Sequence, residues 1–447
     1  MKNKSIAGFS KLSKEEKIDW LAAHFLDNPA QAKAELASFW HRDEALQRVF
    51  DGFSENTVSN YYLPYGIAPN FLIDGKLYAV PMAIEESSVV AAASSAAKFW
   101  FSRGGFKTQV LATRKIGQVH FNWTGEGQLL FQHFDELQAR LRQDAAHLTA
   151  NMEKRGGGVQ AIELLDFSAV EPHYYQLKVA FETCDSMGAN FINSVLEEFG
   201  STLRIFVQEH PAFAASAGEL EIIMAILSNY TPDCLVRAEV ACPIEALGED
   251  CGKAMTPQEF AEKFAKAVRI AHLDPHRAAT HNKGIFNGVD AVVLATANDF
   301  RAVEAGCHTY AARDGQYRSL SHCSLEGGIF RFWLDLPLAL GTVGGLTKLH
   351  PLARLSLELL GQPSAAELMS IIAATGLAQN FAALRSLVTT GIQQGHMKMH
   401  LMNILNHLGA NEQETTRAAA YFEDKVVSYT GVREFLAALR QQQARVA

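Results

Sequence analysis

Cysteine is scarce in this sequence, and the cysteines are scattered rather than closely spaced. There are six cysteines in 447 residues and no CxxC spacing. A zinc ribbon or a disulfide framework requires closely spaced or regularly paired cysteines, so neither is indicated. We expect reduced thiols in a cytoplasmic protein.

The usual glycine motifs for nucleotides are also missing. The sequence contains no GxGxxG motif, which argues against a standard Rossmann dinucleotide site. The glycine-rich stretch 341–345 lacks the GK[ST] ending of a Walker loop. A dinucleotide cofactor therefore needs a site of another kind.

Positive charge and long apolar runs are lacking as well. The formal net charge is −8, whereas general nucleic-acid and anionic-membrane surfaces have a basic excess. No apolar run is long enough to span a bilayer, and no signal-peptide core follows the N-terminal lysines. We expect no nucleic acid and no membrane as partners. The composition, 48% hydrophobic and 20% charged, is that of a folded globular protein with two or three domains.

What the chain does contain is an acidic pair before a run of small residues. Glu85 and Glu86 precede a stretch rich in alanine and serine. Alanine favours helix, so we expect a helix from about Ser88 to Phe101, ended by Arg103-Gly104-Gly105, around which the chain is organised. Acids at the head of such a helix either take part in proton transfer or merely offset the helix dipole.

The remaining chain alternates between helical and strand-like segments. Residues 13–50 have the pattern of two or three amphipathic helices, and Ser13 and Glu16 have the spacing of a capping box. From about Thr108, strand-like runs surround one charged helical pattern, Phe134 to Lys154. This alternation suggests a small α+β domain inserted into a larger one. The strand-like runs are 110–113, 118–123, 159–167 and 174–183.

The turn from Asp185 to Asn190 follows the last of these strands and opens a helix to about Phe199. A helix N-terminus can bind an anion, and a glycine at such a junction is also common for packing alone. Further on, 257–270 is helical, 291–297 is either a strand or a buried helix, and the residues beyond 363 are almost wholly compatible with helix.

Two groups of histidines raise the question of a metal site. His272, His276 and His281 lie close together in the sequence, and His396 and His400 stand four apart on an expected helix. No glutamate stands beside His396, as HExxH requires, and we expect no metal. His396 is either a proton donor or a packing residue.

Lys283 is the remaining polar candidate. It stands among asparagines and glycines, and Asp299 follows the next apolar run. Such a lysine either forms a buried ion pair that stabilises a developing oxyanion or lies in a surface loop.

Taken together, these fragments resemble the signature stretches of one family, 3-hydroxy-3-methylglutaryl-coenzyme A (HMG-CoA) reductase, and more closely its bacterial class II branch. The similarity covers nearly the whole chain, and six motifs in the right order are too many for chance. The motifs are Glu86 with Ser88, Asp185-Ser186-Met187-Gly188-Ala189-Asn190, His281-Asn282-Lys283-Gly284, Asn298-Asp299, Gly341-Thr342-Val343-Gly344-Gly345 and Gly395-His396-Met397.

The resemblance implies a fold and a division of the chain. The fold class would be α/β (α+β), with a large mixed helix and sheet domain around a central helix, an inserted small ferredoxin-like, non-Rossmann cofactor domain and a C-terminal helical flap. The large substrate and dimerisation domain would span 1–110 and 220–388, the small NAD(P)-binding domain 111–219, and the flap 389–447. Members of the family are built on dimers with the active site at the subunit interface, so the resemblance implies a homo-oligomer.

The resemblance also implies a reaction. Family members interconvert HMG-CoA with mevalonate and CoA in the mevalonate pathway of isoprenoid synthesis, using two NAD(P)H and passing through mevaldehyde. By position, Lys283 would polarise the thioester oxygen, Asp299 would hold Lys283, and Glu86 would exchange a proton with Lys283 and with the aldehyde. His396 would protonate the departing CoA thiolate.

Matching positions imply the binding residues too. Ser88, Arg277 and Asn287 would hold the hydroxymethylglutaryl group, Arg277 through the free carboxylate. The cofactor would face the turn before the small-domain helix, at Asp185, Met187, Gly188, Ala189 and Asn190.

Thr149 bears on the choice between NADPH and NADH. NAD-preferring relatives carry an aspartate at the end of the small-domain helix, where it would repel a 2′-phosphate. This chain has Thr149 there, with Lys154 and Arg155 nearby. We therefore expect NADPH and a biosynthetic direction. The alternatives are degradative mevalonate oxidation with NAD, a non-catalytic acyl-CoA-binding protein of this fold, and a zinc hydrolase using the histidines at 272, 276 and 281.

Overall fold

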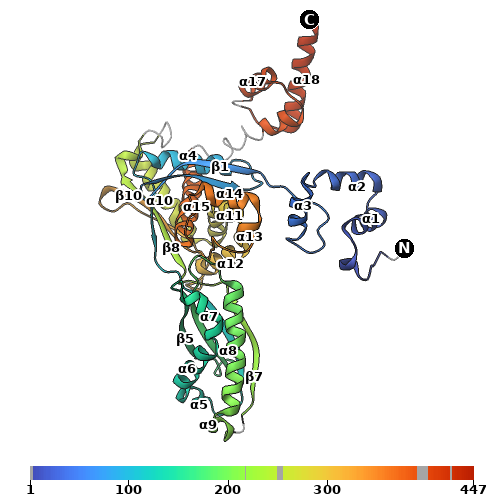
Figure 1. Cartoon of the computed structure of the whole chain (residues 1–447). Coiled ribbons are helices and arrows are strands. Elements are labelled where there is room, and N and C mark those ends of the chain that lie inside the picture. Colours follow the sequence, from blue (N-terminus) through green and yellow to red (C-terminus); the bar gives the residue numbers. More distant parts are fainter. Residues whose placement is uncertain (1–3, 217, 249–254, 390–400, 423–424, 447) are drawn as a thin grey trace.

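The computed structural model describes residues 4–216, 218–248, 255–389, 401–422 and 425–446. Figure 1 shows a main body of mixed helices and strands from which an elongated insert extends. Helices α1 (Lys14–Phe25), α2 (Pro29–Ser38) and α3 (Glu44–Asp51) lie to one side of the body, and α17 (Glu412–Tyr421) and α18 (Tyr429–Val446) lie beyond another edge. The expected mixed α/β class is confirmed.

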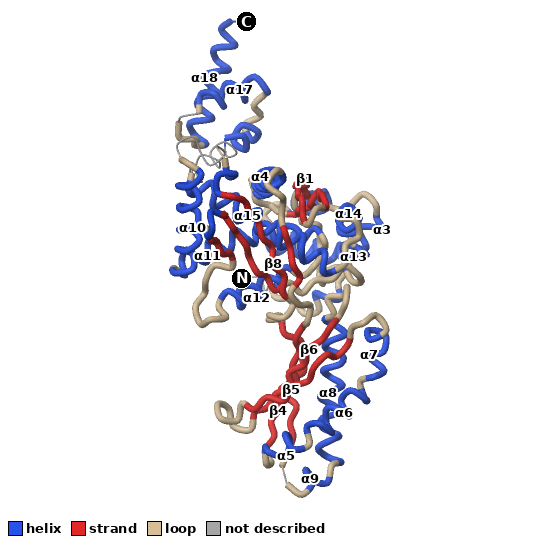
Figure 2. Tube along the Cα trace, turned by 90° about the vertical axis from the view of Figure 1, so that its left-hand side faces the viewer, coloured by secondary structure: helices blue, strands red, loops and turns tan. Residues whose placement is uncertain are grey.

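The insert, residues 115–228, is built on a four-stranded antiparallel sheet in the order β5-β6-β4-β7. Figure 2 shows its longer helices along one face of this sheet. Its last strand begins at Leu220, so the sheet continues beyond the expected domain boundary at 219. Its elements are β4 (Lys115–Trp123), α5 (Gly127–Gln132), α6 (Phe134–Asp144), α7 (Ala146–Glu153), β5 (Gly158–Asp166), β6 (Tyr174–Glu182), α8 (Ala189–Glu209), α9 (Pro211–Ala214) and β7 (Leu220–Ser228).

Local sequence explains how the insert packs. Helix α8 buries Ile192, Val195, Leu196 and Phe199, which recur at the spacing of one helix face. The helix approaches β4 closely because Gly117 faces it: a Cβ there would lie 2.5 Å from a methyl carbon of Leu196. The expected helical pattern 134–154 is two helices, α6 and α7, and α8 runs ten residues past its expected end at Phe199.

The main body has a second antiparallel sheet, in the order β3-β8-β10-β9, and a separate β1–β2 hairpin. Helix α15 packs on this sheet, and α4 and α11 pack on α15 and on the hairpin. The strands are β1 (Tyr65–Ile73), β2 (Lys76–Ala83), β3 (Lys107–Val110), β8 (Leu235–Pro243), β9 (Ser321–Ser324) and β10 (Ile329–Pro337). The helices are α4 (Val89–Phe101), α10 (Pro257–Leu273), α11 (Pro275–Ala295), α12 (Phe300–Ala311), α13 (Leu346–Leu349), α14 (Pro351–Leu359) and α15 (Ala365–Val388), with short 3₁₀ turns at Phe9–Lys11, Ile244–Leu247 and Glu326–Gly328.

The helix at the centre of the body is α15 rather than the expected one after the acidic pair. Of its 24 residues, 17 are buried, whereas α4 buries six of 13 and keeps one side open. A helix that is apolar on all sides is stable only when it is buried on all sides. Helix α15 is buried in this way, whereas α4 is not. Helix α15 is also long and apolar enough to cross a membrane, but 72% of its most apolar window is buried inside the protein. It is therefore a core helix.

Candidate active site

A large cavity lined by described residues lies between α4, α11 and α15 and has a volume of about 950 Å³. That size suits a small-molecule ligand. Five residues expected in the active site line it, although they come from two segments almost two hundred residues apart. They are Glu86, Ser88, Arg277, Lys283 and Asn287.

Glu86 and Lys283 form an ion pair in this cavity, with 2.8 Å between Lys283 Nζ and Glu86 Oε2. Glu86 lies between β2 and α4, and Lys283 lies in the middle of α11. The side chains are 39% and 61% exposed, so both remain accessible to a ligand. Lys283 thus lies in a helix rather than in a surface loop, but the ion pair it forms is open to solvent and not buried as the other alternative had it.

The cavity is strongly cationic. Glu86 is the one acidic residue among its described lining residues, against five cations: Lys98, Arg103, Arg277, Lys283 and Arg385. Arg277 is half-buried, and its burial lowers the pKa of the guanidinium. Among the described residues, Arg277 makes no side-chain hydrogen bond or ion pair. A buried cation without a partner favours an anionic ligand at this place.

A buried polar network supports the cavity wall and was not foreseen from the sequence. His281 is 1% exposed, and its Nε2 lies 2.7 Å from the hydroxyl oxygen of Ser321, which in turn donates to Asn380 Oδ1 at 2.7 Å. Burial, reinforced by the positive charge of Arg277, lowers the pKa of His281 to about 3. The neutral ring thus ties α11 to β9 and α15.

The histidines of the zinc alternative have other partners. His272 Nε2 lies 2.9 Å from the carbonyl oxygen of Ser321, His281 is held as described above, and His276 is exposed. Within the described ranges of the chain, these three do not gather into a group with metal-ligand spacing. Residues 396 and 400 lie outside the described residues.

Asp299 differs from its expected place beside Lys283. It is the N-cap of α12, and its carboxylate accepts from the backbone N–H groups of Arg301 and Ala302. The Arg301 guanidinium also pairs with it at 3.2 Å. Among the described residues, the lysine's ion pair is with Glu86, and Asp299 is not in the cavity wall. A helix N-terminus attracts a carboxylate, which explains this arrangement.

The expected cofactor turn, residues 185–190, lies where the insert joins the body. The glycine-rich loop 341–345 packs directly on it: Thr342 N–H donates to the Asp185 carbonyl at 2.8 Å, and a Cβ on Gly341 would lie 2.4 Å from Met187 N. Met187 and Ala189 line a small cavity between insert and body, Gly188 caps α8 with φ +84°, and Asn190 is exposed. The turn 185–190 and the glycine-rich loop 341–345, which are far apart in the sequence, therefore pack together at one place in the fold.

Lys115 holds this turn through hydrogen bonds, and nothing in the sequence had identified it as a site residue. It is 4% exposed, donates to the carbonyl oxygen of Ser186 at 2.8 Å and also donates to the hydroxyl of Thr183. Burial lowers the pKa of Lys115, partly opposed by nearby groups such as Glu182. Its neighbours Arg114 and Ile116 give no local pattern that separates Lys115 from a surface lysine.

Thr149 does not have the position that a cofactor contact requires. It is 3% exposed in α7, and its hydroxyl lies 3.4 Å from the carbonyl oxygen of Ala146, within the same helix. Lys154 and Arg155, by contrast, are exposed at the end of this helix. The buried hydroxyl of Thr149 is turned toward its own helix, so its expected place beside a 2′-phosphate has no support from this geometry and stays a prediction.

Comparisons with known proteins agree with the site. A sequence profile of the family described as hydroxymethylglutaryl-coenzyme A reductase matches residues 14–401. The 3-hydroxy-3-methylglutaryl-coenzyme A reductase of Archaeoglobus fulgidus is 37% identical over 418 residues, 92% of this chain and 89% of that protein. A probable reductase of the same name from Borreliella burgdorferi is 32% identical over 385 residues, 85% of each chain.

Solved structures are similar over comparable lengths. The class II 3-hydroxy-3-methylglutaryl-CoA reductase from Streptococcus pneumoniae, bound to NADPH in open conformations, gives a TM-score of 0.69 at 39% identity over 86% of this chain and 100% of that one. Another structure of the reductase from that organism gives a TM-score of 0.70 at 38% identity, over 97% and 100%. With a profile that matches most of its length and relatives that align over most of theirs, this chain belongs to the hydroxymethylglutaryl-coenzyme A reductase family, NAD(P)-dependent oxidoreductases of the mevalonate pathway.

Proposed function

We propose that the chain reduces HMG-CoA to mevalonate and CoA in the cavity between α4, α11 and α15, as a class II-type enzyme. One observation carries the proposal: the ion pair between Glu86 and Lys283, 2.8 Å apart, in a cavity whose other charged lining residues are cations. The substrate has a free carboxylate and, on its CoA part, phosphates. A cationic cavity attracts such a molecule and neutralises it.

The hydroxymethylglutaryl group would be held by three side chains of the cavity wall. Arg277, half-buried and without a partner among the described residues, would pair with the free carboxylate. Ser88 and Asn287 line the same cavity and would bind the hydroxyl and carbonyl groups. Ser88 adopts φ +75°, an uncommon backbone conformation for a residue with a side chain.

Lys283 would carry the chemistry at the thioester. Negative charge develops on the carbonyl oxygen as the thioester is reduced, and a fixed ammonium group stabilises that charge. Glu86, in contact with Lys283, would return a proton to the lysine or to the aldehyde oxygen in the second reduction. The nicotinamide cofactor supplies the two hydrides.

Two catalytic roles rest on the family resemblance alone. Asp299 would have to leave Arg301 to reach Lys283, which the 78% exposure of the arginine side chain permits. His396 would protonate the CoA thiolate, which leaves more readily beside an acid because a thiol has an ordinary pKa of about 8.5. Its segment lies outside the described residues.

The turn 185–190 and the start of α8 suit a dinucleotide. The N-terminus of a 21-residue helix offers backbone N–H groups to a phosphate, and the β-α-β-β-α-β order of the insert is ferredoxin-like rather than Rossmann. Asp185, Met187, Gly188, Ala189 and Asn190 would face the cofactor. We propose NADPH over NADH because Lys154 and Arg155 are exposed cations nearby. Comparing kcat/KM for both cofactors tests this, and a strong preference for NADH would refute it.

The complete site would form between two copies of the chain. The large cavity and the cofactor turn share no lining residue, and in Figure 1 α4 lies at the edge of the body opposite the insert. A partner subunit would therefore bring its cofactor turn to this cavity, in a homo-oligomer built from dimers and located in the cytoplasm. Closure of the C-terminal flap, residues 389–447, would exclude water from the reacting groups.

The deciding experiment follows cofactor absorbance with HMG-CoA, for the wild-type chain and for Lys283→Ala. We expect two equivalents of NADPH oxidised per HMG-CoA, no effect of a chelator, and loss of turnover in the variant. Absence of turnover with binding retained would favour a non-catalytic acyl-CoA-binding protein, and activity that a chelator abolishes would favour the zinc hydrolase. A much faster reverse reaction with NAD would favour degradative mevalonate oxidation.

A further inference from the structure

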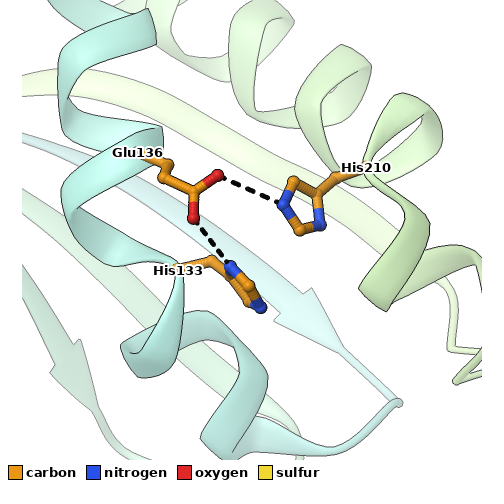
Figure 3. A group of neighbouring side chains, drawn as sticks. All are labelled: His133, Glu136 and His210. Atoms are coloured by element: carbon orange, nitrogen blue, oxygen red, sulfur yellow. Dashed lines mark hydrogen bonds and ion pairs between the residues drawn. The ribbon is translucent and has the colours of Figure 1, made fainter.

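A group of metal-ligating side chains lies at the end of the insert farthest from the large cavity. His133 stands between α5 and α6, Glu136 is in the first turn of α6, and His210 links α8 to α9. His133 Nδ1 lies 3.1 Å from Glu136 Oε1, and His210 Nε2 lies 3.3 Å from Glu136 Oε2. Figure 3 shows the carboxylate between the two imidazole rings.

Packing fixes the orientation of both rings. Their centroids are 4.3 Å apart, and Phe213 packs edge-on against both of them. Phe206 stacks on the ring of His210. The histidine side chains are 24% and 18% exposed, and Glu136 is 62% exposed. The group is therefore held in place from inside the protein and open to solvent on the side of the carboxylate.

We propose that His133, Glu136 and His210 bind one Zn²⁺ ion or a similar divalent transition metal. Imidazole and carboxylate are the ligands such ions take from proteins, and three protein ligands with water in the fourth position is a common zinc arrangement. One ligand atom from each residue lies within 4.8 Å of the others. Bonds of about 2.0–2.1 Å in a tetrahedral site put neighbouring ligand atoms roughly 3.3 Å apart. The nitrogen–oxygen distances of 3.1 and 3.3 Å are near that size, although each involves a different oxygen of Glu136, so a small turn of the carboxylate would complete the site.

The ion would replace several existing hydrogen bonds of these residues. His210 Nδ1 accepts a long hydrogen bond, 3.3 Å, from the backbone N–H of Ala212. Zinc on Nε2 places the ring proton on Nδ1, so this contact would be given up at the start of α9. Both histidines also interact with Glu136 through the nitrogens that would bind the ion, so the metal would replace these two contacts as well.

The bound metal would join two corners of the insert that are 74 residues apart in the chain. One corner is the α5–α6 junction and the other is the α8–α9 junction. The site is far from the cavity proposed for HMG-CoA, so its role would be to stabilise the insert rather than to take part in the reduction. Because the ion would bind only the folded state, the unfolding temperature should rise with the logarithm of the free metal concentration above Kd.

Zinc titration of the full-length chain, prepared without a histidine tag and freed of metal by a chelator, tests the proposal. We expect one equivalent of Zn²⁺ to bind in calorimetry, and Co²⁺ to give the visible spectrum of a site with nitrogen and oxygen ligands. In His210→Asn and in Glu136→Gln the affinity should fall at least about tenfold. Asparagine is chosen because it can still cap α9.

Three controls keep the result interpretable. The chain has 16 histidines, any of which could bind zinc weakly, so a control variant is needed. His147→Ala removes an exposed histidine of the same insert that lies outside the proposed site, and it should bind zinc as the wild type does. Turnover with HMG-CoA and NADPH should be unchanged in these variants, which shows that they fold. If His210→Asn fails to fold, His133→Gln takes its place. No saturable zinc binding by the wild type, or equal binding in His210→Asn, would overturn the proposal, whatever the outcome for the reductase activity.

Discussion

The carboxylate of Asp185 accepts the backbone N–H of Ala365 at 2.7 Å. This bond joins the turn before α8 to the first residue of α15, the central helix of the body. The first N–H groups of a helix have no partner within the helix, and a negative charge there is favourable. Asp185 therefore fastens the proposed cofactor turn to the body with the same side chain that the family resemblance places near the cofactor.

Replacing Asp185 should lower stability by an amount that depends on the acceptor left behind. Asp185→Ala leaves the N–H of Ala365 unsatisfied, and we expect the free energy of unfolding to fall by about 1 kcal/mol. Asp185→Asn keeps an oxygen acceptor, so its loss should be smaller. Urea unfolding of both variants measures the difference. Unchanged stability in Asp185→Ala would show that the bond contributes nothing.

The two neighbouring glutamates provide a matched test of the active site. Glu86 pairs with Lys283, whereas Glu85 is exposed and makes no hydrogen bond or ion pair among the described residues. Glu86→Gln should lower kcat by about 10²–10⁴-fold, the usual contribution of a proton-transfer group. Glu85→Gln should stay near the wild-type value. Steady-state kinetics with HMG-CoA and NADPH measure both, and equal losses would remove Glu86 from its proposed role.

Two glycines of α11 should respond in opposite ways to alanine. A Cβ on Gly288 would lie 2.8 Å from the carbonyl oxygen of Thr375 in α15, whereas a Cβ on Gly284 would meet nothing within 4 Å. We expect Gly288→Ala to cost about 1–3 kcal/mol through overpacking. Gly284→Ala should gain up to about 1 kcal/mol, because alanine favours helix. Thermal unfolding compares the two, and a neutral Gly288→Ala would mean that the helices can separate without cost.

The C-terminal helices should loosen in acid. Hydrogen bonds from Arg440 and from the backbone of Asn411 lower the pKa of Glu414 from its ordinary 4.5 to about 2. Because the folded value is the lower one, the ionised carboxylate stabilises α17 against α18 at neutral pH, and this contribution is lost as the pH falls from about 4.5 to 2. The protection of amide hydrogens in both helices, relative to the intrinsic exchange rate at each pH, should decrease over that interval.

Glu414→Gln isolates this effect. The variant should show exchange roughly tenfold faster in α17 and α18 at neutral pH, and it should lose the acid dependence. Mass spectrometry of peptides from the two helices reports both. An acid dependence that persists unchanged in Glu414→Gln would assign it to other groups.

Local features of the fold were accessible from the sequence because they depend on neighbours in the chain. The capping box of Ser13 and Glu16 begins α1 as expected, and the helix expected at 257–270 is α10, three residues longer. Strands β5 and β6 lie within one residue of the strand-like runs 159–167 and 174–183. Caps and periodicity are set within a few residues, so they leave a readable pattern.

Helix α11 shows where the local pattern was insufficient. Its segment contains Asn282, Gly284, Asn287 and Gly288, which are poor helix formers, and 291–297 was ambiguous between strand and helix. The structure makes all but the last two of these residues part of one helix because Gly288 lets it cross α15 closely. Tertiary packing outweighs helix propensity here, and it settles that Lys283 lies in a helix, which the local pattern left open.

Residue types and their order along the chain are properties of the amino-acid sequence, and the order of six motifs was enough to indicate the family. The tertiary structure alone decided the partners: Glu86 with Lys283 across 197 residues, Asp299 with Arg301, Asp185 with α15, and Thr149 inside the insert. Hydrogen bonds form only within about 3.5 Å. Pairs that meet across hundreds of residues leave no local pattern in the sequence, so only the folded chain reveals them.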